Sequence, residues 1–565
     1  MSIHVVIVQR PDALAPLPPS VARLGTLGAL QILGAPNTPI LARDGLILLG
    51  WAFHRDSLAP LRQLDDGAAG RIKEEGHAWV YRHLWGNFFL VWHDRHGVPR
   101  LLRSPPAGQA IYYEAGRGAQ SEPGDIIAFT DLGLARALGL RPLRPEPAAL
   151  DSHIRFPLMR GPHTGIAGIA ELLPGEAVDL QTRTLLPGAW TPWSRVPGSP
   201  RRILPEELRA CVEGVVGSWA DCFGQIQLEL SGGLDSSIVA ACLQDRKAPW
   251  RAVNLATPGI PGDEREYARA SAAHAGTSLA EIVMPDEETD PIAPIPIPRA
   301  RPGGFGLLGS SDEALLAAAQ DFGADAIFTG VGGDNVFGYI RKAGPVADAL
   351  RFAGFGAAWG AASDLATMTG DSVWRALRLA LLQLVRAPRL WPRDPSLLTT
   401  KYDREAPDHP WLTIPPGIAP GQFGYGRALM PIQLFVDGYD RSFAMPMIAP
   451  LLSQPIVELG LQGASWDWCA GGHDRALARA AFADRLAPMV RDRRTKGRVE
   501  SLFVTSYNRR RGSIREFLLE GYLASAGIID RDAVDAALQL PADALDAVYI
   551  RLLQIADVER WIRSL

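Results

Sequence analysis

The chain has 565 residues, of which 47% are apolar and 21% are charged, and its formal net charge is −4. A single hydrophobic core stops growing near roughly 250 to 300 residues, so this length predicts two or more domains of a globular protein. The small negative charge gives no reason to expect nucleic acid or an anionic membrane as a partner.

The N-terminus and the cysteines bear on the compartment in which the protein works. Met1-Ser2-Ile3-His4 has no basic segment followed by a long apolar run, so we expect no signal peptide. Cys211, Cys222, Cys242 and Cys469 show no C-x-x-C spacing, which is typical of a reducing compartment without a metal-thiolate site. Both features predict a cytoplasmic protein.

Short apolar segments separated by Gly, Pro and Asp fill the first part of the chain and indicate a β-rich domain. Prolines then recur at short intervals from Pro187 to Pro205 with little apolar periodicity, as in a linker. We therefore expect a first domain at residues 1–190, a linker at 191–205 and a second domain at 206–565. The apolar segments of the first domain are 4–10, 38–53, 88–92, 100–103 and 110–113.

Two phrases of the first domain resemble the glutamine amidotransferase domain of asparagine synthetases. They are the stretch from Gly86 to Asp94, followed by Arg103 and Tyr112-Tyr113, and Leu172-Leu173-Pro174-Gly175-Glu176. That family uses a cysteine after the initiator methionine as its nucleophile, whereas this chain has Ser2. The family's Asn-Gly-Glu phrase for holding glutamine falls on Leu49-Gly50-Trp51. The resemblance therefore implies a degenerate, structural domain, with a hydroxyl nucleophile at Ser2 as the alternative.

In the second domain, apolar segments of strand length alternate with segments of helix length. This alternation predicts a parallel sheet with helices on both faces, and ligands collect at the carboxyl ends of such strands. Residues 349–368 are interrupted by Arg351 and Asp364, so they predict a helix of the fold and not a membrane span. The expected strands are 226–230, 250–256, 279–284 and 325–329, and the expected helices are 236–244, 263–275 and 312–322.

The turn after the first of these strands is predicted to bind an anion. Gly232 and Gly233 let the backbone approach a phosphate, and the N-terminus of the next helix points its N–H groups at it. The hydroxyls of Ser231, Ser236 and Ser237 would add donors. Asp235 in such a turn predicts a cation beside the phosphates, best a magnesium ion. The alternative is an ordinary corner in which Ser caps a helix.

The string from Ser231 to Ser237 resembles the pyrophosphate-binding Ser-Gly-Gly-x-Asp-Ser loop of the ATP pyrophosphatase superfamily, which includes asparagine synthetase. A second turn, Gly330-Val331-Gly332-Gly333-Asp334, resembles the Gly-x-Gly-x-Asp motif of asparagine and β-lactam synthetases, whose aspartate binds magnesium. The resemblance implies ATP and Mg²⁺, with Asp334 reading as a helix cap in the alternative. Nucleotide contacts would come from Ser231, Gly232, Gly233, Asp235, Ser236, Ser237 and Gly332, and metal contacts from Asp235 and Asp334.

One lysine stands among arginines late in the chain. Lys496 is one of only five lysines, and four arginines lie between Arg491 and Arg498. A compact ammonium that can shed a proton differs chemically from a guanidinium. The segment resembles that of the catalytic lysine of the synthetases, so Lys496 is expected to stabilise an oxyanion and the departing AMP. A solvated basic loop is the alternative.

His473-Asp474-Arg475 precedes this lysine. The trio is expected to open a helix with Asp474 as its cap. A proton acceptor at His473 is the alternative.

Taken together, these motifs look like those of a lasso-peptide macrolactam cyclase. The fold implied is a two-domain α/β protein, in which a degenerate N-terminal-nucleophile, class II amidotransferase-like α+β sandwich precedes a parallel-sheet ATP pyrophosphatase domain with a helical C-terminal part. The activity implied is an AMP-forming carbon–nitrogen ligase that adenylates an Asp or Glu side chain of a precursor core peptide and joins it to the peptide's N-terminal amine. The partners implied are a leader peptidase and a leader-recognition protein.

Val331 departs from the synthetase pattern, because related enzymes carry an acid or a tyrosine there. Valine cannot move a proton, which favours a nucleophile that needs no dedicated base, such as a peptide N-terminus. A β-lactam-synthetase-like ligase, an ammonia-dependent asparagine-synthetase-like ligase and a non-catalytic scaffold that holds a peptide remain open.

Overall fold

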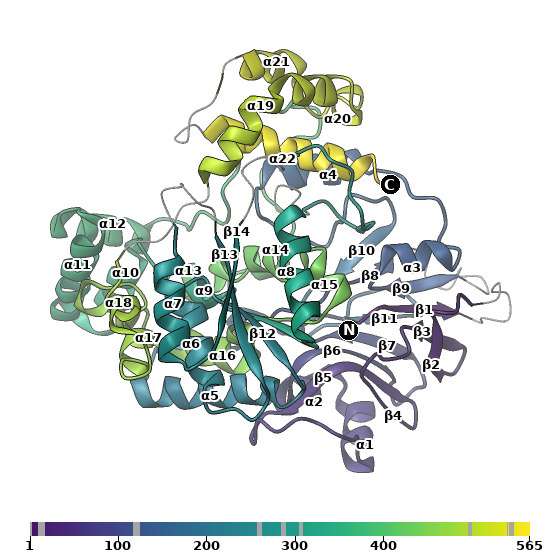
Figure 1. Ribbon diagram of the computed structural model, residues 1–565, viewed down its shortest axis with the longest axis horizontal. Helices are drawn as coiled ribbons and strands as arrows, with labels where there is room; N and C mark the ends of the chain where they lie inside the picture. Colours follow the sequence, from purple (N-terminus) through teal and green to yellow (C-terminus); the bar gives the residue numbers. More distant parts are fainter. Residues whose placement is uncertain are drawn as a thin grey trace.

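A computed structural model of the chain contains two antiparallel sheets, one parallel sheet and a largely helical C-terminal part (Figure 1). This arrangement confirms the predicted mixture of α/β elements, including the parallel sheet and the helical C-terminal part. The structure describes residues 3–9, 17–116, 125–256, 263–283, 290–303, 309–494, 500–539, 541 and 547–565.

The two antiparallel sheets come from the first 180 residues and confirm that this part is rich in β-structure. The first sheet has the order β10 (Ile169–Leu172), β8 (Ile111–Glu114), β9 (Ile126–Phe129), β1 (Val5–Gln9), β3 (Leu30–Gly34) and β2 (Ala22–Leu27). The second has the order β11 (Ala177–Asp179), β7 (Pro99–Arg103), β6 (Leu84–His93), β5 (Leu46–His54) and β4 (Ile40–Arg43).

Alternation along β1 explains how the sheets pack. Val5 and Ile7 lie in one buried cluster with Ile47 of the second sheet, so the two sheets pack face to face. Val6 and Val8 point the other way, into a cluster shared with the C-terminal helices. Because side chains alternate across a strand, one five-residue element joins two cores.

The parallel sheet has the order β14-β13-β12-β15-β16, and every neighbouring pair is parallel. All four predicted strands are present, and the two-residue strand β16 is an addition that the sequence did not predict. Helices α6 and α7 lie on one face of the sheet and α8 on the other (Figure 1). The elements are β12 (Ile226–Glu229), β13 (Trp250–Ala256), β14 (Leu279–Val283), β15 (Ala326–Thr329), β16 (Met447–Ile448), α5 (Pro205–Ala220), α6 (Leu234–Leu243), α7 (Arg265–His274) and α8 (Gly309–Phe322).

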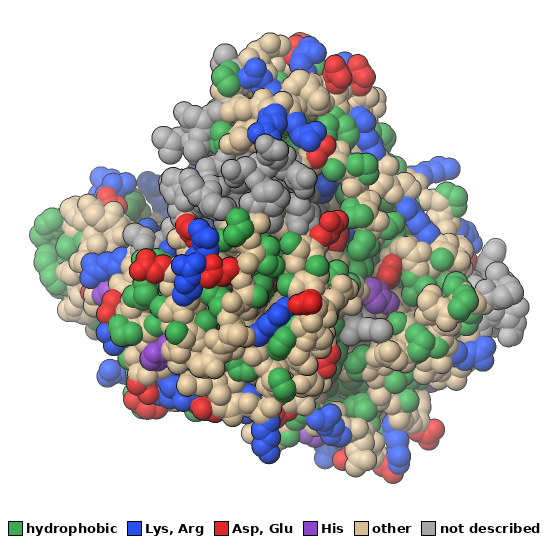
Figure 2. Space-filling model, viewed as in Figure 1, with side chains coloured by type: hydrophobic (Ala, Val, Ile, Leu, Met, Phe, Trp, Pro, Cys, Tyr) green, Lys and Arg blue, Asp and Glu red, His purple; other side chains and the backbone are tan. Residues whose placement is uncertain are grey.

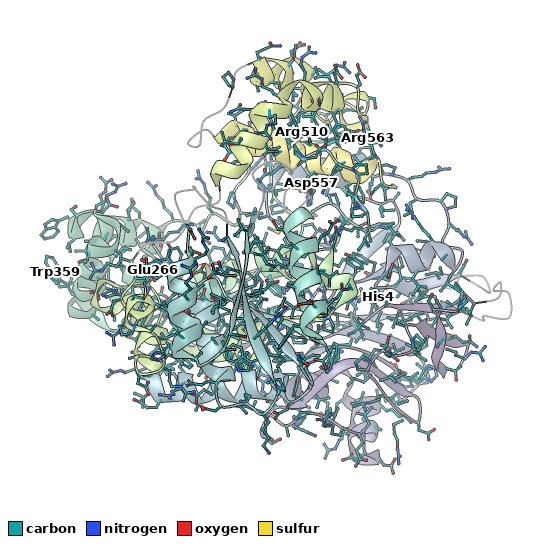
Figure 3. The ribbon with its side chains drawn as sticks, in the orientation of Figure 1. His4, Glu266, Trp359, Arg510, Asp557 and Arg563 are labelled. Atoms are coloured by element: carbon teal, nitrogen blue, oxygen red, sulfur yellow. The ribbon has the colours of Figure 1, made fainter. Side chains whose placement is uncertain are left out.

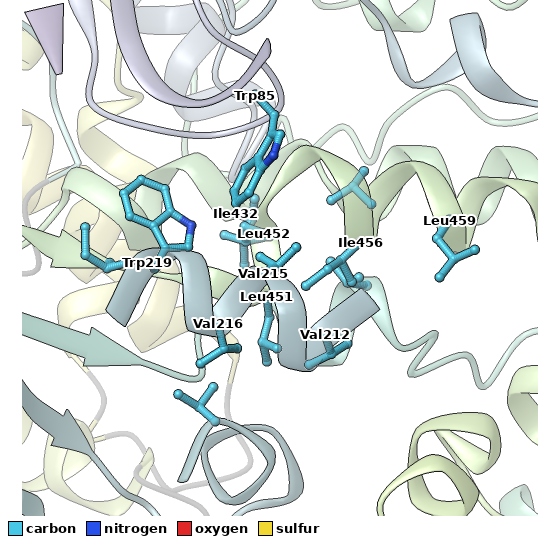
Figure 4. Close-up of a cluster of buried hydrophobic side chains, with 14 of the residues drawn as sticks. Trp85, Val212, Val215, Val216, Trp219, Ile432, Leu451, Leu452, Ile456 and Leu459 are labelled. Atoms are coloured by element: carbon cyan, nitrogen blue, oxygen red, sulfur yellow. The ribbon is translucent and has the colours of Figure 1, made fainter. Parts of the chain in front are cut away.

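Helix α5 joins the β-rich part to the parallel sheet through buried apolar side chains (Figure 4). Its Val212 and Val216 belong to the same cluster as Trp85 of β6 and Leu451. The preceding segment, predicted as a linker, is itself packed, since the indole N–H of the buried Trp193 donates to the Trp411 carbonyl at 2.8 Å. Residues on both sides of this segment therefore share one core.

The remaining helices include one difference from the sequence prediction. The single helix expected at 349–368 is two helices, α10 and α11, because Gly354 adopts φ +84° and ends the helical path between them. The other α-helices are α1 (Asp66–Glu75), α2 (His77–His83), α3 (Leu132–Ala137), α4 (Pro147–Arg155), α9 (Gly333–Val336), α10 (Gly344–Phe352), α11 (Gly354–Thr369), α12 (Val373–Val385), α13 (Pro420–Ala428), α14 (Leu434–Asp437), α15 (Arg441–Ala444), α16 (Gln454–Gln462), α17 (Ala476–Ala481), α18 (Pro488–Arg491), α19 (Glu500–Leu519), α20 (Tyr522–Ser525), α21 (Arg531–Gln539) and α22 (Ala547–Ile562).

Charged side chains of both signs are interspersed on the face shown in Figure 2. Exposed apolar side chains gather at the free end of the α11–α12 lobe, where Trp359 (labelled in Figure 3) packs between Phe355 and Trp374 at ring distances of 6.2 and 5.3 Å. Among the described helices, none is long and apolar enough to cross a bilayer.

His4, labelled in Figure 3, lies just before β1 and contacts Asp131 and helix α15 through its two ring nitrogens. Nδ1 lies 2.8 Å from Asp131 Oδ2, and Nε2 lies 2.7 Å from the Phe443 carbonyl oxygen. A carboxylate and a carbonyl only accept hydrogen bonds, so the protonated ring can donate to both of them. Burial lowers the pKa of His4, but Asp131 and the Phe443 carbonyl outweigh burial and raise it above 6.5.

We expect this contact to make stability depend on pH. Since the folded-state pKa of His4 is raised, its stabilisation is complete below pH 6.5 and is lost as the pH rises through the folded-state value. The His4→Gln variant should therefore lose about 1 kcal/mol more unfolding free energy at pH 5.5 than at pH 8.5, measured by urea denaturation. The control is His163→Gln, whose contact with Asp408 is exposed on both sides; an equal pH dependence there would contradict the prediction.

Candidate active site

The first predicted turn has the geometry of an anion-binding corner. Gly233 is the N-cap of α6, so the first N–H groups of the helix face the end of β12. The Ser231 hydroxyl accepts from the Gly233 N–H at 3.2 Å and lies 3.2 Å from the Ser236 hydroxyl. The Ser237 hydroxyl donates to the Gly233 carbonyl at 2.8 Å. The side chains predicted to surround a phosphate thus lie in one tight loop.

Gly232 is required by this loop for two reasons. Its φ of +76° lies in the left-handed region that other residues avoid. A Cβ placed on it would lie 2.5 Å from the Ala268 backbone nitrogen, at the start of α7. The close approach of the turn to α7 therefore excludes any side chain here.

The second predicted turn follows β15, which is the direct neighbour of β12 in the sheet. Gly332 adopts φ +89° and is the N-cap of the short helix α9, whose first turn carries Asp334. A Cβ on Gly332 would collide with the Leu452 side chain. Only glycine fits at position 332, and this turn places the Asp334 carboxylate at the start of α9.

The two turns touch each other. A Cβ added to Gly330 would lie 2.5 Å from the Ser236 backbone nitrogen, and one added to Gly333 would lie 2.5 Å from Asp235 Cβ. Both turns border one cavity of about 540 Å³ at the carboxyl edge of the parallel sheet. The edge predicted from the strand order is therefore where the two motifs meet. Val331, Ile432, Phe435 and Tyr439 add apolar and aromatic surface to the cavity lining.

Arg475 joins the two aspartates. Its Nη1 lies 2.6 Å from Asp334 Oδ1 and 3.3 Å from both carboxylate oxygens of Asp235. One guanidinium nitrogen thus occupies the space between the two carboxylates that were predicted to bind a metal. Its other edge faces Asp474, with Nε 3.0 Å from Oδ1, and its centre lies 5.3 Å from the centre of the Tyr339 ring.

The electrostatics of this group follow from burial and charge. Burial lowers the pKa of Arg475, but Asp235, Asp334 and Asp474 more than offset it, so the guanidinium stays charged. Burial likewise raises the pKa of Asp474, while Arg475 and Arg479 bring it below the ordinary value. Arg475 and Asp474 are therefore both ionised near neutral pH.

The expectation that Asp474 caps a helix is wrong. Helix α17 begins at Ala476, and its N-cap is Arg475, in the left-handed conformation at φ +53°. Asp474 instead pairs with Arg475 and Arg479, so it holds the arginine that reaches the two turns. The His473 side chain has a contact with Arg494 at 3.4 Å.

Two aspartates and the loops around them fit a magnesium ion that arrives with phosphate. Among the described residues no group of three or more His, Cys, Asp or Glu side chains could hold a metal alone. Mg²⁺ usually binds one or two carboxylates and completes its shell with water and phosphate oxygens. The donor set of Asp235 and Asp334 matches that preference.

A second arginine at the cavity was not predicted from the sequence. Arg493 pairs with Glu264 at 2.6 Å and lies 3.9 Å from the centre of the Tyr267 ring. Glu264 is the N-cap of α7, where an acidic side chain complements the helix dipole. The structure shows that it also ties the segment after α18 to α7, next to Gly232.

Two predicted groups lie outside the described residues. Lys496 falls within 495–499 and Ser2 within 1–2, so the structure does not place either of them. The described chain ends at Arg494 on one side of Lys496, one residue beyond the Arg493 contact at the cavity.

Apolar packing fills the place of Leu49-Gly50-Trp51, where the family's glutamine-holding phrase falls. Leu49 is fully buried, and a Cβ on Gly50 would lie 2.7 Å from the Ile3 side chain. The Trp51 ring packs against Phe223, with ring centres 5.5 Å apart, and against Trp219 at 6.4 Å. Apolar packing thus takes the place of polar side chains that could bind an amide.

A parallel sheet with two glycine-containing turns and paired aspartates at its carboxyl edge defines an α/β protein with a candidate ligand site at that edge. Residues 223–563 match the model of the family described as Asparagine synthase. Because this match covers more than half of the chain, the protein belongs to the asparagine synthase family.

One curated relative is carboxyethyl-arginine beta-lactam-synthase of Streptomyces clavuligerus, which is 29% identical over 272 residues. The match covers 46% of this chain and 47% of that protein, so it spans about half the length of the relative.

Proposed function

We propose that this protein is an ATP-dependent, AMP-forming amide ligase that closes a macrolactam ring in a short precursor peptide. The observation that carries the ligase part is the meeting of two glycine turns around Asp235, Asp334 and Arg475 at one sheet edge. Membership of the asparagine synthase family supports the same chemistry and the use of ATP. The peptide substrate rests on the resemblance to lasso-peptide cyclases.

The first step forms an acyl-adenylate. A side-chain carboxylate of the peptide attacks the α-phosphorus of ATP, the bond from that phosphorus to the bridging oxygen breaks, and pyrophosphate leaves. The N–H groups at the start of α6 and the hydroxyls of Ser231, Ser236 and Ser237 would hold the departing pyrophosphate. Gly332 would let the backbone of the second turn approach the nucleotide.

Asp235 and Asp334 would hold the Mg²⁺, which offsets the negative charge that builds on the leaving group. Before a nucleotide binds, Arg475 contacts both carboxylates and places a positive charge between them.

In the second step the N-terminal amine of the peptide attacks the acyl carbon, loses a proton, and AMP departs as the amide forms. Lys496 is proposed to stabilise the oxyanion and the leaving AMP. Val331 lines the cavity and offers no base. A peptide amine has a pKa near about 7.7 to 8.0, so roughly a third of it is neutral at pH 7.5.

The packing at Leu49, Gly50 and Trp51 supports a first domain that no longer supplies ammonia from glutamine. We further propose that the enzyme is cytoplasmic and works beside a leader peptidase, which would create the free amine, and a leader-recognition protein. The interspersed charge on the face shown in Figure 2 gives no support for a nucleic-acid partner.

Closure of a small amino acid is the second candidate, because the relative of 29% identity is named a beta-lactam-synthase. Val331 speaks against it, and against an ammonia-dependent asparagine synthetase, because both related enzymes use an acid or a tyrosine there. A non-catalytic scaffold is the least supported candidate, because both turns contain the serines, glycines and aspartates expected of a working synthetase site.

Pyrophosphate release tests the proposal. Purified protein, ATP and Mg²⁺ should release pyrophosphate only when a peptide with a free N-terminal amine and an internal Asp or Glu is present, and the product should be the peptide minus one water. Release with a small amino acid instead would favour the second candidate. Tight peptide binding without release would favour a scaffold.

The lack of a base at Val331 predicts a specific pH dependence. Amide formation by the wild type should fall about tenfold between pH 7.0 and pH 6.0 as the peptide amine becomes protonated, with pyrophosphate release much less affected. A Val331→Glu variant should flatten this dependence and gain coupling to ammonia. The amide product is measured by mass spectrometry. Equal use of ammonia and peptide by the wild type would contradict the proposal that the nucleophile is a peptide amine.

A further inference from the structure

Arg475 holds the place in which a bridging metal ion would sit. A single atom, Nη1, is within 3.3 Å of oxygens from both Asp235 and Asp334. Mg²⁺ needs such oxygens at about 2.0 to 2.1 Å in a near-octahedral shell. The guanidinium and the ion therefore cannot share this space.

The arginine is fixed in this position from several sides. Its side chain is only 10% exposed, its Nε pairs with Asp474, and its backbone takes the left-handed conformation at φ +53°. Arg479 holds Asp474 in turn, with Nη2 3.1 Å from Oδ1. The bridge across the two turns is thus a built part of the fold.

Charge decides what happens when a ligand arrives. Without phosphate, a metal ion that displaced Arg475 would leave a buried guanidinium beside a divalent cation, which is strongly unfavourable. A triphosphate brings several negative charges, so the displaced guanidinium gains new partners while the ion takes the carboxylates.

We infer that Arg475 is an internal counter-ion that excludes free Mg²⁺ from Asp235 and Asp334, so the metal enters only together with the nucleotide. This inference rests on the proposed function, because it takes a nucleotide as the ligand of the same cavity. It assigns Arg475 a positioning role before the reaction, in addition to its charge during it.

Calorimetric titration of the nucleotide-free protein with MgCl₂ tests this. The wild type should show no saturable binding in the low-millimolar range, whereas Arg475→Gln should bind Mg²⁺ about tenfold or more tightly. Arg475→Lys keeps the charge and should resemble the wild type. The control Arg375→Gln removes the same charge from an exposed pair on α12 and should change nothing.

A second measurement uses the wild type alone and so does not depend on a variant folding. The spectrum of free Mn²⁺ should be unchanged by the nucleotide-free protein and should diminish when α,β-methylene-ATP is added. Equal Mn²⁺ binding with and without the nucleotide would overturn the inference, as would Mg²⁺ binding by the wild type as tight as that of Arg475→Gln. If metal alone binds but pyrophosphate release is intact, only the inference fails; if neither nucleotide binding nor release occurs, the proposed function fails.

Discussion

Replacing Asp334 with asparagine is expected to lower the rate of peptide-dependent pyrophosphate release by about 10²- to 10³-fold. The substitution keeps the shape of the side chain and removes one of the two carboxylates that face Arg475. With one negative charge fewer, the site holds Mg²⁺ less well while charge develops on the leaving pyrophosphate. Initial rates of pyrophosphate release at saturating ATP measure the effect.

Asp235→Asn should have an effect of the same size, because both carboxylates act on the same ion. For that reason the double variant should lose little more than either single variant. Asp245→Asn, at an exposed pair with Arg485, is the matched control and should retain full activity. Activity of Asp334→Asn within tenfold of the wild type would exclude a metal role for this residue.

The elements around these aspartates could be predicted because their signals are local. The apolar run before Ser231 and the glycines after it identify a strand and a turn within a dozen residues. That both turns lie at the carboxyl edge of the sheet also follows from the sequence, because ligand-binding turns of a parallel sheet follow the carboxyl ends of its strands. The direct pairing of β12 with β15 could not be predicted in this way, because β13 and β14 come between them in the chain.

Arg475 could not be found in the same way. Its partners lie 240 and 141 residues earlier in the chain, and nothing in the local pattern signals a contact at that range. The rule that Asp before a helix acts as a cap pointed to Asp474, one residue too early, because the left-handed backbone of Arg475 moves the helix start. Arg493 was not predicted for the same reason, because its partner Glu264 lies in a distant part of the chain.

In the β-rich part, the sequence analysis did not predict β2, β3, β9, β10 and β11; of these, β3 and β9 are fully buried, whereas β2, β10 and β11 have weak patterns. Strand β2 is mostly exposed or half-buried along its length, so it lacks the clear alternation of β1. Strands β10 and β11 have only four and three residues and lie at either end of the phrase from Leu172 to Glu176. The sequence showed Glu171 beside the Leu172 phrase but gave no sign of its partners.

Those partners make Glu171 the residue whose loss should cost the most stability. Its carboxylate is fully buried and contacts Arg103 at 2.7 Å, Arg160 at 2.9 Å, and Arg301. Glu171→Gln would leave three buried guanidinium groups without this charge, and we expect a loss of about 3 to 5 kcal/mol in unfolding free energy. Denaturation by guanidinium chloride at pH 7 measures it.

The pH dependence gives this prediction a second, independent test. Burial raises the pKa of Glu171, but Arg160, Arg301 and Arg103 outweigh burial and hold it well below the ordinary value. A lowered folded-state pKa means that the stabilisation is complete above the unfolded value of about 4.3 and is lost as the pH falls below it. The difference in unfolding free energy between the wild type and Glu171→Gln should therefore become smaller as the pH is lowered.

The control is Glu207→Gln, which removes the same charge from an exposed pair with Arg201 and should cost less than about 1 kcal/mol. If Glu171→Gln does not fold, Arg301→Gln still tests the cluster, because it leaves the carboxylate two arginine partners and should be destabilised to a smaller extent. Equal denaturation midpoints for Glu171→Gln and Glu207→Gln would mean that the buried ion pairs of Glu171 do not hold Arg301 to the β-rich part. The loop at Arg301 would then need another anchor to stay against the first sheet.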